Sequence, residues 1–253
     1  MQKLEKITAY LDKLLKIDAF ADGSNNGLQV QNSGKVKKIA CGVDADLATF
    51  EAAHECGADL LVVHHGISWG DSLKRITDMN YERIAYLMRN DMALYAAHLP
   101  LDAHPRYGNN ALICRLLGLH NIRPFGSYHG QVIGFQGELP RAVTFDVLFE
   151  NVRKKLNPEI RTMPFGGKRV KRVAAISGGG GADLLAEAAR AGVDAFISGE
   201  ATLAAWGVAR DMRIHAVYAG HYATETLGVS ALAKCLKQRF KIPAEFISLD
   251  VPY

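Results

Sequence analysis

The chain has 253 residues, of which 49% are hydrophobic and 22% are charged. This composition excludes an intrinsically disordered chain, because it supplies enough apolar side chains for a sizeable core. The length suits two domains of ordinary size. No apolar run approaches the ~20 residues that a membrane helix needs, and the charged N-terminus is unlike a signal peptide. We therefore expect a cytoplasmic protein that does not engage a membrane.

The charge and the cysteine content further narrow the possible classes of protein. The 30 Lys and Arg residues and 26 Asp and Glu residues give a net charge of +4, and the cations are spread along the chain. A dedicated nucleic-acid-binding protein gathers its cations in a stripe, so we do not expect nucleic acid as a partner. The four cysteines lie far apart without a Cys-x-x-Cys pair, which predicts free thiols and neither disulfides nor a structural zinc site. A soluble enzyme is the default class.

Hydrophobic periodicity in the first half predicts alternating helices and strands. In chain order, the expected elements are a helix over 4–15, a strand over 36–43, a helix over 44–56, a strand over 59–63, a helix over 81–90, a strand over 92–97 and a helix over 109–117. A strand, a helix and a second strand at this spacing form a parallel βαβ unit. We expect residues 98–102 to be a loop that no helix includes, because of Pro100.

The second half of the chain echoes the first, as an ancient duplication would produce. Three segments match in the same order, and they pair residues 38–41 with 172–175, 57–62 with 192–197, and 91–97 with 211–217. One short match can arise by chance, whereas three in the same order favour a duplication. The predicted fold class is therefore α/β, with two related, duplicated α/β domains.

The domain boundaries follow from this repeat. We assign residues 1–126 and 227–253 to the first α/β domain and residues 127–226 to the second. The second domain carries a β insert, in which a glycine-broken strand pair over 130–139 is followed by an amphipathic helix over 144–156. We expect this insert to pack on the second half of the chain.

Aligning the two halves places polar residues directly after strands, at the edge where open α/β sheets bind ligands. The four positions are His64 with His65, the segment His98 to Asp102, Gly199 with Glu200, and His221 with Glu225. In the last pair, a spacing of four directs both side chains to one side of a helical first turn. Imidazoles and carboxylates together suit divalent Zn, Mn or Fe, and their number fits two ions better than one. The alternative is that they are ordinary polar residues at strand ends and helix starts.

A run of four glycines, Gly178 to Gly181, follows a strand over 173–176 and opens a helix over 182–191. Loops that bind phosphate are built in this way. No Gly-Lys-Ser/Thr sequence follows, however, so the run is not a P-loop. We favour a tight turn that needs positive φ angles, with a phosphate site as the alternative.

Seven motifs spread over almost the whole chain carry a family resemblance. They are Asn26-Gly27-Leu28-Gln29-Val30, Val63-His64-His65-Gly66, Ala97-His98-Leu99-Pro100-Leu101-Asp102, Gly137-Glu138-Leu139-Pro140, Arg172-Val173-Ala174 with Ser177-Gly178-Gly179-Gly180, Ile197-Ser198-Gly199-Glu200 and Gly220-His221-Tyr222-Ala223-Thr224-Glu225. On these motifs the chain resembles the GTP cyclohydrolase I type 2 family, also called NGG-interacting-factor-3-like. Many relatives have Thr where this chain has Leu99, a difference that leaves the neighbouring Asp102 in place.

The resemblance implies a dinuclear site of two divalent metal ions, Zn, Fe or Mn, between the two domains. The family's ligands fall on five residues of this chain, which are His64, His65, Asp102, His221 and Glu225. Glu225 would bridge the two ions. The resemblance also implies a ring-shaped homohexamer.

Two functional hypotheses follow. In the first, the chain is a hydrolase that acts on GTP or a related purine nucleotide through a metal-bound hydroxide. His98 and Glu200 are then the catalytic residues that transfer protons, or alternatively residues that orient a ligand. In the second, the protein handles metal or forms a ring-shaped scaffold without turnover. The two hypotheses share the metal ligands, so formate release from GTP discriminates them.

Overall fold

The computed structural model describes residues 1–252, which fold as two compact units. Unit 1 contains residues 1–101 and 228–250, and unit 2 contains residues 102–227 with 251 and 252. The segment 102–126, which the repeat assigns to the first domain, packs within unit 2, because its helix contacts two strands of that unit's sheet. Among the helices of residues 1–252, each is too short or too polar to traverse a lipid bilayer.

Unit 1 is built on a five-stranded sheet with the strand order β13-β4-β5-β6-β2. Its elements are β1 (Gln2–Lys3), α1 (Leu4–Leu15), a 3₁₀ turn (Ile17–Ala19), β2 (Gly27–Val30), β3 (Lys35–Val36), β4 (Ile39–Asp44), α2 (Leu47–Glu55), β5 (Leu60–His65), α3 (Asp78–Arg89), β6 (Ala93–Ala96), the later turns of α9 (His221–Phe240) and β13 (Ala244–Phe246). Strands β4, β5 and β6 are parallel, and β2 runs antiparallel to β6 at the edge. The predicted βαβ units are therefore confirmed.

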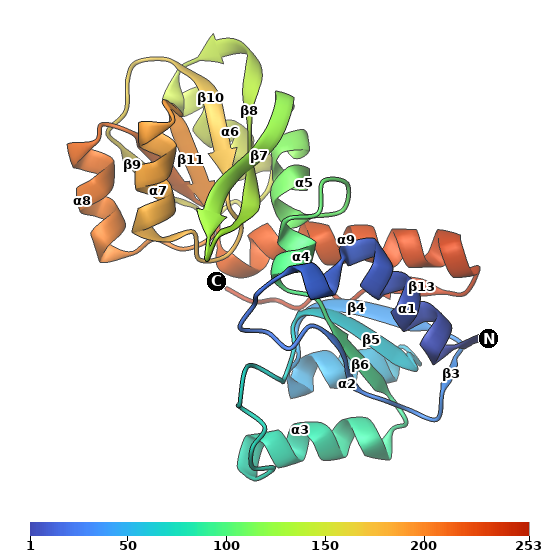
Figure 1. The fold of residues 1–253 in the computed structure, drawn as a ribbon. Helices are drawn as coiled ribbons and strands as arrows, with labels where there is room; N and C mark the ends of the chain where they lie inside the picture. The colour runs from blue at the N-terminus through green and yellow to red at the C-terminus, as the bar shows by residue number, and fades with distance from the viewer. Residues whose placement is uncertain (253) are drawn as a thin grey trace. The chain divides into compact units, whose positions relative to one another are not determined.

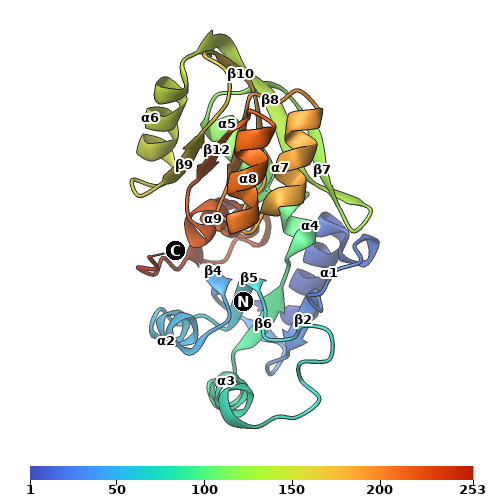
Figure 2. The same cartoon turned by 90° about the vertical axis from the view of Figure 1, so that its left-hand side faces the viewer.

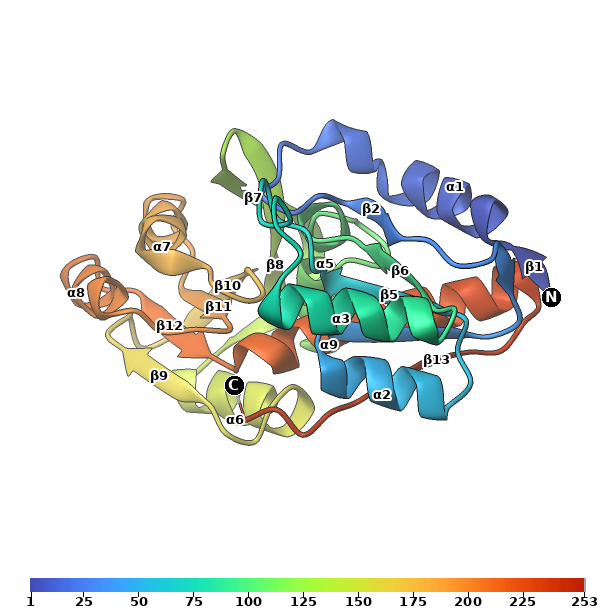
Figure 3. The same ribbon diagram turned by 90° about the horizontal axis from the view of Figure 1, so that it is seen from below.

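Helices cover both faces of the unit 1 sheet, with α2 and α3 on one face and α1 and α9 on the other (Figures 1 and 3). The first face buries Phe50 of α2 and Leu87 of α3 against Leu61 and Leu94 of the strands. Helix α2 begins at Leu47, three residues after the predicted start at 44, because the Asp46 carboxylate accepts a hydrogen bond from the Thr49 N–H, as an N-cap does. Apolar side chains at helical spacing bury one side of α1 as expected.

Unit 2 is built on a six-stranded sheet with the order β7-β8-β10-β11-β12-β9. Its elements are the end of α4 (Leu99–Asp102), α5 (Asn109–Leu116), β7 (His120–Tyr128), β8 (Gln131–Val143), α6 (Phe145–Lys155), β9 (Arg161–Pro164), β10 (Val170–Ala175), α7 (Gly181–Arg190), β11 (Ala195–Ser198), α8 (Leu203–Asp211), β12 (His215–Tyr218) and the first turns of α9. Only β10, β11 and β12 are mutually parallel. Helices α7 and α8 lie side by side over one face of this sheet (Figure 2).

The loop predicted over residues 98–102 is wrong, because Leu99–Asp102 form the single helical turn α4. Pro100 is the second residue of that turn. Proline is tolerated there, since the first residues of a helix have no intrahelical partner for their N–H groups and the proline ring has no preceding turn to clash with. The turn is closed by a hydrogen bond from the Leu101 N–H to the His98 carbonyl oxygen.

Candidate metal centre

Three histidines of unit 1 converge at the carboxyl ends of two adjacent parallel strands. His64 and His65 end β5, and His98 follows β6, which pairs with β5 in the register that sets Val63 opposite Ala96. One ring nitrogen from each histidine lies within 4.8 Å of the other two. His64 is fully buried, while His65 and His98 are partly exposed. This is the carboxyl-edge cluster that the sequence predicts, and its composition could hold a metal ion.

The Nδ1 atom of each of these three rings lies within hydrogen-bond distance of an oxygen atom. The distances are 2.9 Å from His64 Nδ1 to the Ala97 carbonyl oxygen, 2.8 Å from His65 Nδ1 to Asp44 Oδ1 and 2.9 Å from His98 Nδ1 to Asp22 Oδ1. A carbonyl oxygen can only accept, so His64 carries its proton on Nδ1 and presents the Nε2 lone pair. Histidines that bind metals through Nε2 are oriented in this way by an acceptor on the other nitrogen.

Asp22 is a functional residue that the sequence reasoning missed. Its side chain is 2% exposed, and its carboxylate accepts hydrogen bonds from His98 Nδ1, the Leu99 N–H and Asn26 Nδ2. Burial by itself raises the pKa of Asp22, but the hydrogen bonds from His98 and Asn26, with the charge of His98, outweigh it and hold the pKa at about 2. Asp22 is therefore an ionised acceptor that fixes the orientation of His98.

Other residues of the segment 22–29 form hydrogen bonds with the loops that carry the histidines. Asn26 Oδ1 accepts from the His98 N–H at 2.8 Å, and Gln29 Oε1 accepts from the N–H groups of Ile67 and Ser68. Part of this segment belongs to the family motif Asn26 to Val30, to which the sequence alone assigns no role. The sequence signal for this role is the high proportion of Asp, Asn and Gln in the segment, because their side chains can form hydrogen bonds with backbone groups.

In unit 2, His221 and Glu225 face the same side of the first turn of α9, as their spacing predicts. His221 Nε2 lies 3.2 Å from Glu225 Oε1, and His221 Nδ1 lies 2.7 Å from Glu200 Oε1. The hydrogen bond to Glu225, and the further bond and charge of Glu200, outweigh the opposing effect of burial and raise the pKa of His221 to about 9. Glu225 is 2% exposed, whereas the Glu200 side chain is half-exposed.

Asp102 is buried in unit 2 and held by two donors. Its Oδ1 atom accepts from Ser177 Oγ and from Asn109 Nδ2, each at 2.9 Å. Among the described residues of unit 2, Asp102 does not join a group of three or more His and carboxylate ligands at close range. Its place in a ligand set therefore remains a prediction.

The glycine run forms the tight turn that the sequence favours, with φ angles of +59° at Gly178 and +62° at Gly181. Its backbone braces the neighbouring segments, because the Gly178 carbonyl oxygen accepts from the N–H groups of Gly199 and Glu200. A Cβ atom at Gly178 would overlap the Glu225 carboxylate. Glycine is thus required at Gly178 for two reasons, the positive φ angle and the closeness of a candidate ligand.

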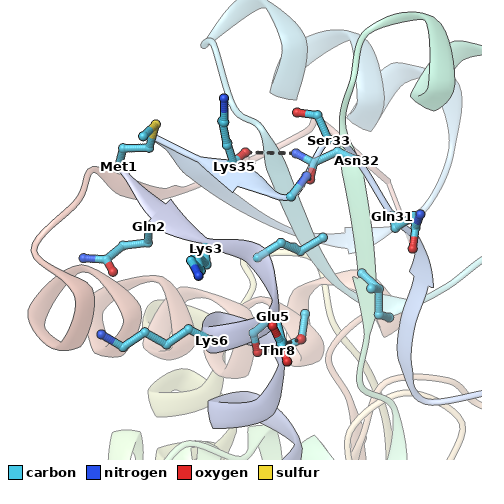
Figure 4. A pocket seen from close by; sticks show the side chains of 13 residues that line it. Met1, Gln2, Lys3, Glu5, Lys6, Thr8, Gln31, Asn32, Ser33 and Lys35 are labelled. Carbon is cyan, nitrogen blue, oxygen red and sulfur yellow. Dashed lines mark hydrogen bonds between the residues drawn. The ribbon is translucent and has the colours of Figure 1, made fainter.

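A surface pocket of about 940 Å³ lies elsewhere in unit 1, between the start of α1 and residues 31–35 (Figure 4). Its polar lining includes the lysines Lys3, Lys6 and Lys35. None of the predicted site residues lines this pocket. The pocket therefore adds nothing to the candidate metal centre.

Comparisons with known proteins match almost the full length of the chain. The family model described as Duf34/NIF3 (NGG1p interacting factor 3) matches residues 2–251. A protein of Archaeoglobus fulgidus named GTP cyclohydrolase 1 type 2 homolog is 43% identical over 249 residues, covering 98% of each chain. A protein of the same name from Deinococcus radiodurans is 41% identical over 244 residues, covering 96% of this chain and 92% of the relative.

Solved structures show the same fold. The protein TTHA1606 of Thermus thermophilus superposes with a TM-score of 0.91 at 33% identity, and the match covers 100% of both chains. The protein HcgD of Methanocaldococcus jannaschii, described in its reduced form, has a TM-score of 0.84 at 28% identity and covers 99% of this chain and 98% of its own.

Proposed function

Because the chain belongs to the Duf34/NIF3 family, we propose that it is a dinuclear metal-dependent hydrolase acting on GTP or a related purine nucleotide. The observation that carries this proposal is the convergence of His64, His65 and His98, with the Nδ1 atom of each ring against an oxygen. This arrangement orients the imidazoles of His64 and His65 for metal binding and holds His98 beside them. The name shared by the curated relatives supplies the nucleotide as substrate class.

The donor set fits borderline divalent ions such as Zn, Fe or Mn. We propose His64, His65, Asp102, His221 and Glu225 as the ligands of two ions, with Glu225 shared by both. In support of two duplicated domains, each sheet contains three adjacent parallel strands, β4-β5-β6 and β10-β11-β12, with an antiparallel strand beside the last of them, β2 beside β6 and β9 beside β12. The unit 1 sheet has a fourth parallel strand, β13, beside β4.

When bound, the two ions would lower the pKa of a water molecule and polarise the atom that it attacks. The chain's own residues would bind the nucleotide and move protons. Asp22 holds His98 with one ring nitrogen turned toward His64 and His65, so we propose His98 as the group that protonates a departing ring nitrogen. Glu200 is the second proposed proton carrier, and its hydrogen bond to His221 Nδ1 also suits it to orient that ligand.

The test is formate release from GTP by protein loaded with Zn, Mn or Fe and by the same protein after metal removal. We expect release only from the loaded protein, and its loss in His65→Ala. The matched control is His54→Ala, since His54 is an exposed histidine on α2 outside the cluster. A fully metallated preparation that leaves GTP, other purine nucleotides and phosphoesters untouched would contradict hydrolysis and favour metal handling.

A further inference from the structure

Trp69 lies beside the three-histidine cluster of unit 1. Its ring centroid is 5.0 Å from that of His98, at an interplanar angle of 70°, and 6.0 Å from that of His65. The indole is partly exposed. An indole offers a broad, flat surface on which another planar ring can stack.

The position of Trp69 is fixed by hydrogen bonds from its N–H groups, which do not involve the face of its ring. Indole Nε1 donates to the Gly66 carbonyl oxygen at 2.7 Å, and the Trp69 N–H donates to Ser72 Oγ at 2.9 Å. The backbone also forms an antiparallel bridge with Ser24. Because the indole N–H is already committed, the π surface is what the side chain has left to offer a ligand.

Gly23 supports this interpretation. Gly23 is exposed and has no positive φ angle, so its backbone conformation does not require glycine. A Cβ atom there would lie 3.8 Å from indole Cε3, which is ordinary van der Waals contact, so packing does not require glycine either. A larger side chain at this position would start from a Cβ atom that already contacts the indole. The glycine leaves that part of the indole uncovered.

We propose that Trp69 is the stacking surface for the planar ring of the substrate. A flat heteroaromatic base laid against the indole would stand next to His65 and His98, the histidines that the indole already contacts. This inference rests on the proposed function for its substrate class. It assigns substrate recognition to stacking of the base and not to contacts with the phosphates. Base stacking on an aromatic side chain strengthens binding about 10-fold or more.

The chain contains two tryptophans, Trp69 and Trp206. In Trp206→Phe, the remaining indole fluorescence therefore reports Trp69 alone. Titration of the zinc-loaded variant with guanosine and with GTP should quench it, whereas ribose 5-phosphate and tripolyphosphate, which lack a ring, should not. Trp69→Phe, which keeps Trp206, is the matched control and should stay silent. Equal quenching by the ring-free probes, no response to guanosine and GTP, or a response in the control would each overturn the proposal.

Two further variants separate this inference from the proposed function. Gly23→Leu and Trp69→Ala should raise the dissociation constant for guanosine about 10-fold while their zinc content stays at the wild-type value. Quenching without formate release would leave the stacking role intact and contradict the hydrolase. Formate release with unchanged KM in both variants would leave the hydrolase intact and contradict the stacking role.

Discussion

Four histidines of this chain share one local arrangement, although they lie on different elements. In each, Nδ1 lies within 2.9 Å of an oxygen, which belongs to a backbone carbonyl for His64 and to a carboxylate for the other three. An ordinary surface histidine has no need of such a partner. A ligand histidine does, because the partner fixes both the tautomer and the direction of Nε2.

Asp22→Asn tests the partner of His98. The substitution removes the ionised acceptor of the His98 Nδ1–H, and it leaves a buried group with fewer good hydrogen bonds. We expect a loss of about 1–3 kcal/mol in the free energy of unfolding and a roughly 10–100-fold loss in activity or metal affinity. Urea unfolding measures the change in stability, and metal titration measures the change in metal affinity. The exposed Asp18→Asn is the control, and equal effects in the two variants would contradict the role of Asp22.

His221 predicts a pH dependence for the metal-free protein. Its pKa is raised from 6.5 to about 9 by Glu225 and Glu200, so the folded state holds the proton more tightly than the unfolded state. The resulting stabilisation is fully present below about pH 6.5 and is lost as the pH rises through about 9. Urea unfolding at about pH 6 and at about pH 10 should therefore show a larger decrease in stability for wild type than for His221→Gln. The control His120→Gln alters an exposed histidine and should behave as wild type; equal decreases in all three proteins would contradict the prediction.

At the scale of elements, periodicity predicts the units that carry the site. The alternation of helices and strands locates β5 and β6, and the internal repeat locates β11 and β12, closely enough to show that the polar residues follow strands. Adjacent parallel strands end at one edge, so the clustering of His64, His65 and His98 follows from topology. The spacing of His221 and Glu225 likewise predicts their contact on one helix.

Other features could not be predicted from local pattern. The side chains of Asp22 and Asn26 accept hydrogen bonds from His98, which lies more than 70 positions away, and no periodicity encodes hydrogen bonds between such distant residues. The turn α4 is not predicted because proline is treated as a residue that breaks a helix interior. In a helix of one turn every residue belongs to the first turn, where proline is tolerated. Strand β9 escapes prediction because only Met163 of its four residues is buried, so its sequence shows neither an apolar run nor a repeated alternation.

The glycine turn before α7 supplies a matched pair of variants. Gly178→Ala combines a strained φ angle with overlap of the Glu225 carboxylate, whereas Gly181→Ala has a similar φ angle and no neighbour within 4 Å. We expect Gly181→Ala to cost about 1–2 kcal/mol from backbone strain alone and to keep its metal. Gly178→Ala should cost more and should lose metal. Equal stability and equal metal content in the two variants, measured by thermal unfolding and elemental analysis, would show that Gly178 does not shape the site.

At the scale of the whole molecule, the two units share a sheet plan that agrees with the internal repeat. In each, three parallel strands are joined by helices, and the candidate ligands follow the strands or begin the next helix. A duplication would explain why similar loops in the two halves both carry imidazoles and carboxylates. The ring-shaped homohexamer implied by the family resemblance stays a prediction.

The proposed division of ligands predicts distinct metal losses. Glu225→Ala should lose most of both ions, because the shared carboxylate holds each of them. His221→Ala and Asp102→Ala should each weaken mainly one ion. Elemental analysis of the three variants after identical loading measures this difference. Loss of a single ion in Glu225→Ala would mean that Glu225 does not bridge.

The most direct test of the account is the metal content of the wild-type protein after loading with Zn, Mn or Fe and removal of excess ions. The five proposed ligands, with Glu225 shared, predict two ions per chain. Elemental analysis that finds one ion per chain, or none, under metal-replete conditions would contradict the dinuclear centre.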